Sequence, residues 1–240
     1  MSSERSSGWE FSFGLILLQM VLIIVALTQW HQPALQPVKL LVVLVHEISH
    51  GLMALATGGT VQAIHITPLE SGSCHTTGGN TLLIISAGYL GSMFFGGILL
   101  AFSRSHAHAM AIYALMAFLL FAAGITVMED PYSKKFTFAV GLCSLMIGLI
   151  VPGMISTFLL RCIGTISSLY TLIDIYNDIL SKAARDVNLE SDASMFANLT
   201  ETDPSTVGLA WLVVSLIYFV ITLKLSVSES TVPAPSPSAS

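Results

Sequence analysis

Seven long apolar runs constrain the fold of this chain more than any other feature of its sequence. They cover about residues 11–29, 37–57, 82–102, 109–128, 136–153, 155–176 and 206–225. A helix that crosses the hydrocarbon core of a membrane needs about 20 largely apolar residues. The runs therefore predict an all-α polytopic membrane protein with about six to seven transmembrane helices. Pro152-Gly153 leaves open whether the fifth and sixth runs form two helices or one bent helix.

The composition agrees with a membrane protein and excludes several other classes. Hydrophobic residues make up 54% of the chain and charged residues only 10%, whereas soluble proteins carry about 25% charged residues. The net charge of −5 leaves no basic surface for nucleic acid. The high apolar content makes the lipid bilayer the expected partner. Three cysteines, two of them inside apolar runs, do not predict a disulfide framework.

The polar segments divide the chain into a short tail, one membrane-embedded domain and a second tail. Residues 1–10 form the N-terminal tail, 11–225 the domain, and the Ser/Pro-rich residues 226–240 a disordered tail. The first apolar run lacks the usual small-residue cleavage site and is interpreted as a retained helix. Lys and Arg divide five against three between the two sides, which favours a cytosolic N-terminus and leaves the organelle open.

Two segments outside the apolar runs have a structure of their own. In residues 58–81, Thr60–Thr67 and 73–77 favour β-structure and are separated by a turn at 68–72, which predicts a small β-hairpin. Residues 181–205 are rich in charge, and we expect an aqueous loop with a short amphipathic helix.

Within the runs, two kinds of residue point to helix packing. Arg161 lies inside the sixth run and needs a partner there. The third run carries four glycines: Gly88, Gly91, Gly96 and Gly97. They allow another helix to approach closely, and this helix can be the one formed by the second run.

The second run contains the motif His-Glu-x-x-His at residues 46–50. On a helix this spacing places His46 and His50 on one face, where both imidazoles can bind one metal ion. Neutral imidazoles suit zinc, and Glu47 lies close enough to take a proton from a water on that metal. Ionisable residues within a span are costly and are typical of functional sites. The motif therefore predicts one Zn²⁺ per chain, with Glu47 as the catalytic base.

A catalytic zinc needs a third protein ligand and one open position. Asp174, behind an apolar stretch at the end of the sixth run, is the preferred ligand. Asp178 lies one helical turn further on and is the possible alternative. His65 and His75 in the hairpin segment are rival ligands.

The motif and its surroundings resemble the site-2 protease family of intramembrane zinc metallopeptidases, in particular its small single-domain branch. The resemblance spans roughly residues 36–225 and is carried by 44–51, 58–59, 86–92, 167–170, 190–193, Asp174 and Asp178. It implies that His46, His50 and Asp174 hold zinc inside the membrane and that Glu47 is the general base. Members of the family commonly place the aspartate before a glycine, and this chain contains no Asp-Gly pair.

The resemblance implies a protease that hydrolyses peptide bonds in or near transmembrane segments of membrane-protein substrates. The hairpin segment resembles a membrane-associated strand of the family, to which an unwound substrate segment can add as a further strand. Two alternatives remain open: a non-proteolytic protein of the same fold that binds membrane helices, and a metal transporter. The intact motif disfavours the first, and the position of the other histidines in loops or at span ends disfavours the second. The sequence leaves the substrate, the substrate-binding residues and the oligomeric state open.

Overall fold

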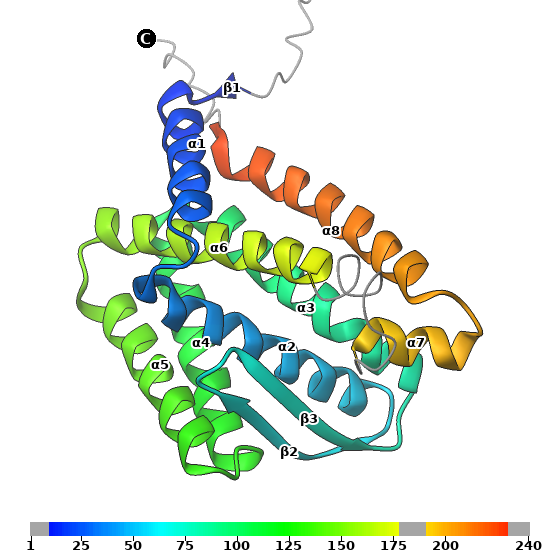
Figure 1. Ribbon diagram of the computed structural model, residues 1–240. Coiled ribbons are helices and arrows are strands. Elements are labelled where there is room, and N and C mark those ends of the chain that lie inside the picture. The colour runs from blue at the N-terminus through cyan, green and yellow to red at the C-terminus, as the bar shows by residue number, and fades with distance from the viewer. Residues whose placement is uncertain (1–9, 178–190, 230–240) are drawn as a thin grey trace, which may run out of the picture.

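The computed structural model describes residues 10–177 and 191–229, and in this part the chain is mostly helical (Figure 1). The α-helices are α1 (Phe13–Thr28), α2 (Gln36–Ala56), α3 (Thr81–Phe102), α4 (His106–Thr126), α5 (Pro131–Ile150), α6 (Gly153–Ile175), α7 (Asp192–Thr200) and α8 (Pro204–Val227). The strands are β1 (Glu10–Phe11), β2 (Thr60–Thr67), β3 (Ser71–Thr77) and β4 (Ser228–Glu229). The predicted fold class, helical with one small hairpin after the second helix, is confirmed.

Six of these helices are long and apolar enough to cross a membrane: α2 with the short 3₁₀ turn before it, α3, α4, α5, α6 and α8. The predicted range of six to seven spans is therefore confirmed, and the chain is a multi-pass integral membrane protein. Helix α1 has 16 residues and falls short of the spanning length. The fifth and sixth runs form two helices, because α5 ends at Ile150 and Pro152 caps the start of α6.

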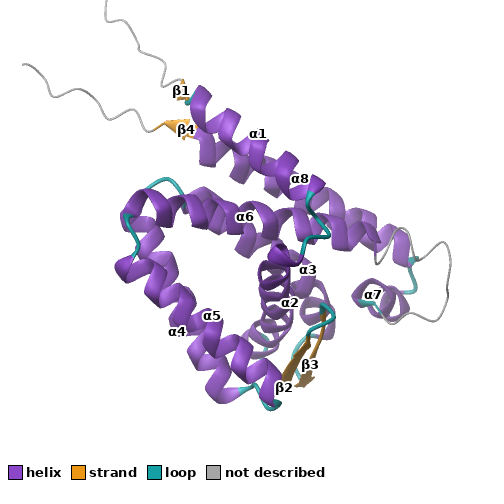
Figure 2. Ribbon diagram, turned by 60° about the vertical axis from the view of Figure 1, so that its left-hand side comes forward, coloured by secondary structure: helices purple, strands orange, loops and turns teal. Residues whose placement is uncertain are grey.

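Close contact between α2, α3 and α6 builds the centre of the molecule (Figure 2). Gly91 of α3 lies against Ser49 of α2, and Gly96 of α3 lies against Ser168 of α6; a Cβ at either glycine would meet these side chains at less than 3 Å. The predicted close approach to the second helix is confirmed. Helices α4 and α5 form a pair at one side, and α8 packs along α3.

The hairpin lies beside α2 (Figure 1), and it contacts both α2 and α5. Its strands pair antiparallel, with Ile64 opposite Cys74. Ile64 and Ile66 of β2 are buried in a core cluster with Val42 and Leu44 of α2. The outer edge of β2 is bonded to the α4–α5 region, where the Ile64 amide donates to the Val127 carbonyl at 2.8 Å. The outer edge of β3 pairs with no strand in the described part of the chain.

Arg161 lies inside a span, where we expected it to have a polar partner, and it has two. Its guanidinium donates to Gln19 Oε1 of α1 at 3.2 Å and to the Ser226 carbonyl of α8 at 2.9 Å. Gln19 in turn donates to Thr165 Oγ1 at 2.8 Å. Arg161 and Gln19 are fully enclosed, so this network ties the short helix α1 to the bundle.

Candidate metal centre

His46 and His50 lie one turn apart on α2, as the motif predicts, with ring centroids 4.7 Å apart. Both rings face α3 at Gly88, which has no side chain. A Cβ at this position would come within 2.5 Å of His50 Nε2 and would also collide with His46 Nε2. The glycine therefore makes the space that the two imidazoles occupy.

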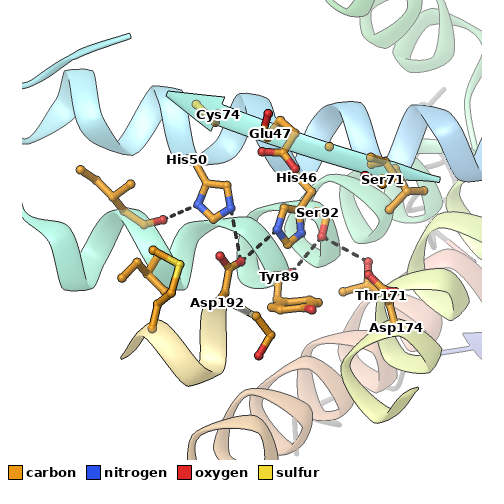
Figure 3. A pocket seen from close by; sticks show the side chains of 18 of the residues that line it. His46, Glu47, His50, Ser71, Cys74, Tyr89, Ser92, Thr171, Asp174 and Asp192 are labelled. Carbon is orange, nitrogen blue, oxygen red and sulfur yellow. Dashed lines mark hydrogen bonds and ion pairs between the residues drawn. The ribbon is translucent and has the colours of Figure 1, made fainter. Parts of the chain in front are cut away.

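Asp192 of α7 completes the cluster (Figure 3). Its Oδ2 lies 3.0 Å from His46 Nε2 and 3.3 Å from His50 Nε2. The ligand atoms of the three side chains lie within 4.8 Å of one another, and no other such group occurs among the described residues. Two imidazole nitrogens and one carboxylate oxygen that converge in this way can hold a divalent metal ion and leave a position for a further ligand.

The three donors are held in orientations that suit a metal. His50 Nδ1 lies 2.7 Å from the Ile84 carbonyl, which can only accept, so Nδ1 carries a proton and Nε2 points to the cluster. The ring of Tyr89 packs edge-on against His46 at 4.8 Å between centroids. Burial alone would raise the pKa of Asp192, but the hydrogen bonds to His46 and His50 outweigh it and hold that pKa well below its usual range. Asp192 is therefore ionised.

A short helix brings Asp192 to this place. Ser191 caps α7, since its hydroxyl accepts from the Ser194 amide at 3.2 Å. Ala193 and Ala197 are buried against Tyr89 and Trp211, which fixes α7 on the bundle. A helix in residues 181–205 was predicted, but its return to the two histidines was not.

Glu47 projects from α2 toward the hairpin (Figure 3) and is only 7% exposed. Its carboxylate packs against Gly72 of β3: a Cβ at Gly72 would lie 2.5 Å from Glu47 Oε1 and 2.9 Å from its Cδ. A backbone without a side chain thus forms one wall around this carboxylate.

The three side chains of the cluster and Glu47 all line one cavity of about 990 Å³. The cavity lies between α2, α3, β3, α6 and α7, and its lining also includes Cys74, Ser92, Tyr170, Thr171 and Asp174. It is large enough for a stretch of polypeptide.

The structure distributes the predicted ligands differently from the sequence-based interpretation. His46, His50 and Glu47 come together as expected. Asp174 lines the same cavity but does not belong to the cluster with the histidines, whose carboxylate comes from Asp192. Asp178 lies outside the described residues.

The two rival histidines lie at the hairpin and face away from α2. His65 Nδ1 lies 2.9 Å from Asp130 Oδ2, and its ring contacts that of His75 at 5.9 Å between centroids. The cluster includes neither of them, because alternate residues of β2 point to opposite faces and the buried Ile64 and Ile66 occupy the face toward α2.

Comparison with known families agrees with this geometry. A family model described as Peptidase M50B-like matches residues 19–222. The chain belongs to the Peptidase M50B-like family. The match contains His46, His50 and Asp192 and confirms the resemblance to site-2 proteases. No curated protein and no solved structure matches the chain. The Peptidase M50B-like family implies a metallopeptidase with protein substrates, and the His/His/Asp cluster fits the metal that such an enzyme needs.

Proposed function

We propose that this chain is an intramembrane zinc metalloprotease that hydrolyses peptide bonds in or near transmembrane segments of membrane proteins. In this proposal His46, His50 and Asp192 hold one zinc ion, and Glu47 is the general base. The observation that carries it is the convergence of Asp192 with the two histidines, next to Glu47, in a member of a peptidase family.

The residues divide the chemistry among them. Zinc held by His46, His50 and Asp192 would supply a Lewis acid that polarises the scissile carbonyl and makes the attacking water more acidic. Glu47 shares the cavity with the three ligands, so its carboxylate accepts a proton from the attacking water and returns it to the leaving amine. Gly72, which has no side chain, leaves the room that this carboxylate occupies.

The hairpin gives the substrate a place to bind. A transmembrane helix hides its carbonyls in its own hydrogen bonds, so a segment has to unwind before it can be attacked. β3 lines the cavity, and within residues 10–177 and 191–229 its outer edge pairs with no further strand. An unwound segment can add to this edge as a third strand.

The test combines metal content with cleavage. Wild type, Glu47→Gln and His46→Ala are purified in detergent and assayed for zinc and for cleavage of a panel of fluorescence-quenched transmembrane peptides. We expect about one zinc in wild type and in Glu47→Gln and none in His46→Ala. Cleavage should fall by about 10²- to 10⁴-fold in Glu47→Gln, because the base is lost while the metal stays.

The cleavage assay, together with a binding and a transport measurement, separates the two alternatives. A zinc-loaded wild type that binds the peptides without cleaving them would be a binder of membrane segments. Movement of zinc into vesicles that contain the protein, without cleavage of the peptides, would indicate a transporter. The described residues, however, contain only one cluster of metal ligands.

A further inference from the structure

The cavity beside the metal cluster is lined by acidic side chains. Four carboxylates line it: Glu47, Glu70, Asp174 and Asp192. Its described lining residues include no lysine or arginine. Asp192 lies with the histidines, and Glu47 is the proposed base. Glu70 is paired with Lys39 of α2, 3.6 Å away. The proposed mechanism gives no role to Glu70 or to Asp174, and of these two Asp174 belongs to α6.

Asp174 lies at the end of the cavity that is remote from His50 (Figure 3). It is in the last turn of α6, one turn after Thr171, whose hydroxyl donates to Ser92 Oγ at 3.4 Å. The two hydroxyl groups line the cavity between the metal cluster and Asp174. This end of the cavity is therefore polar and negatively charged.

The strand β3 connects the two ends. Figure 3 shows Cys74 of β3 toward His50 and Ser71 toward Asp174, and Gly72 between them packs on Glu47. An extended segment advances about 3.3 Å per residue. A segment paired with β3 and cleaved beside Glu47 would therefore run on toward the end of the cavity where Asp174 lies and place a side chain near it a few residues from the cleaved bond.

We propose that Asp174 is the specificity residue of this cavity and selects substrate segments that carry Lys or Arg a few residues from the cleaved bond. The inference rests on the proteolytic function proposed above and adds a substrate class to it. A carboxylate has about four acceptor positions, so it binds a substrate cation alongside a partner from its own chain. Acidic side chains are disfavoured at the same place by repulsion from Asp174.

The chemistry of membrane segments fits such a site. Lys and Arg are enriched at the ends of transmembrane segments, and their long stems let the charge extend to a polar group while the stem stays on apolar surface. Selection by Asp174 therefore directs cleavage to the boundary of a substrate helix, where a basic residue follows the apolar run. It disfavours cleavage in a purely apolar centre.

The first test measures binding in the Glu47→Gln background, which removes cleavage. The probes are fluorescent transmembrane peptides in detergent micelles, identical except that one position, scanned along the segment, is Lys, norleucine or Glu. We expect the best Lys peptide to bind at least about tenfold tighter than its norleucine counterpart. Adding Asp174→Asn should abolish this ratio, whereas adding the control Glu70→Gln should keep it. An unchanged ratio in Asp174→Asn would overturn the inference.

The second test reverses the charge and uses the cleaving enzyme. Asp174→Lys should prefer the Glu peptide in kcat/KM, with its zinc content unchanged, and a merely structural role of Asp174 would not produce this reversal. If wild type cleaves Lys, norleucine and Glu peptides equally, the inference is wrong and the protease function stands. If binding depends on Asp174 as expected but wild type cleaves no peptide, the protease function is wrong and the selectivity stands.

Discussion

Asp192 Oδ2 lies 3.0 Å from His46 Nε2, although 146 residues separate the two along the chain. The contact joins α7 to the middle of α2, and both residues line the cavity. A metal ion held by both residues would cross-link α2 to α7. Four predictions follow from this geometry and from the groups around it.

The identity of the third ligand gives the first prediction. Asp192→Asn should lose metal, with an affinity at least about 100-fold lower than wild type, since removal of a ligand costs more than the 10- to 100-fold typical of a residue that supports a ligand. Asp174→Asn is the matched control, because it makes the same change on the same cavity, and it should keep the metal. Metal analysis of the purified variants decides between them. Metal retained by Asp192→Asn and lost by Asp174→Asn would restore the assignment made from the sequence.

Gly72 tests the wall around the proposed base. In Gly72→Ala the new Cβ would lie 2.5 Å from Glu47 Oε1, so either the carboxylate or β3 has to shift. We expect kcat to fall by about 10²-fold, because displacement by about 1 Å has this effect on catalytic groups, while the metal content stays at the wild-type level. Steady-state kinetics and metal analysis on the same preparation measure both quantities. Full activity in this variant would contradict the expectation that a side chain at residue 72 displaces Glu47.

Gly88 tests the other side of α2, and here we expect the metal to be lost as well as the activity. A Cβ at Gly88 would collide with both imidazoles, so Gly88→Ala should lose the metal together with activity. Gly14→Ala in α1 is the control, because its Cβ would meet a single atom at an ordinary 4.0 Å. Metal binding that survives in Gly88→Ala would mean that α3 moves away from α2 at little cost.

The sequence predicted the parts of this site that depend on local spacing. His46, Glu47 and His50 lie within a single helix, so the period of 3.6 residues determines their relative positions. The hairpin followed from β-favouring residues on both sides of a turn, and β3 begins at Ser71, two residues before the predicted start. The spans followed from apolar length alone.

The third carboxylate depends on tertiary packing, which spacing does not encode. Asp174 was preferred because it follows an apolar run, yet Asp192 reaches the histidines because Ala193 and Ala197 bury α7 against the bundle. A signal was present in the sequence: Ser191 and Ser194 form a capping box around Asp192, and two small apolar residues follow one turn apart. This signal predicts a docked helix but not where it docks.

The last prediction concerns the anchor of the hairpin at Asp130. This residue caps α5 by accepting from the Tyr132 amide at 3.0 Å and the Ser133 amide at 2.9 Å, and it also contacts His65 of β2. Asp130→Ala should cost about 1 kcal/mol of unfolding free energy, as is typical for a lost cap. It should also speed hydrogen exchange of the Ile66 amide, which donates to Ser133 Oγ at 2.8 Å.

Asp203→Ala is the matched control, because Asp203 caps α8 in the same way through the Thr206 amide at 3.0 Å and has no contact with the hairpin among its hydrogen bonds. It should lose similar stability without affecting hydrogen exchange of the Ile66 amide.

The pH dependence of the stability gives an independent check of the role of Asp130. Burial raises the pKa of Asp130, but the hydrogen bonds from Ser133, His65 and Tyr132 outweigh it and lower the pKa from 3.8 to about 2. A lowered pKa means that the folded state favours the ionised form, so its contribution is present above about pH 4 and is lost as the pH falls toward 2. Asp130→Ala should therefore differ from wild type in unfolding temperature at pH 6 and differ less at pH 2.5; an equal difference at both would contradict the role of the charge.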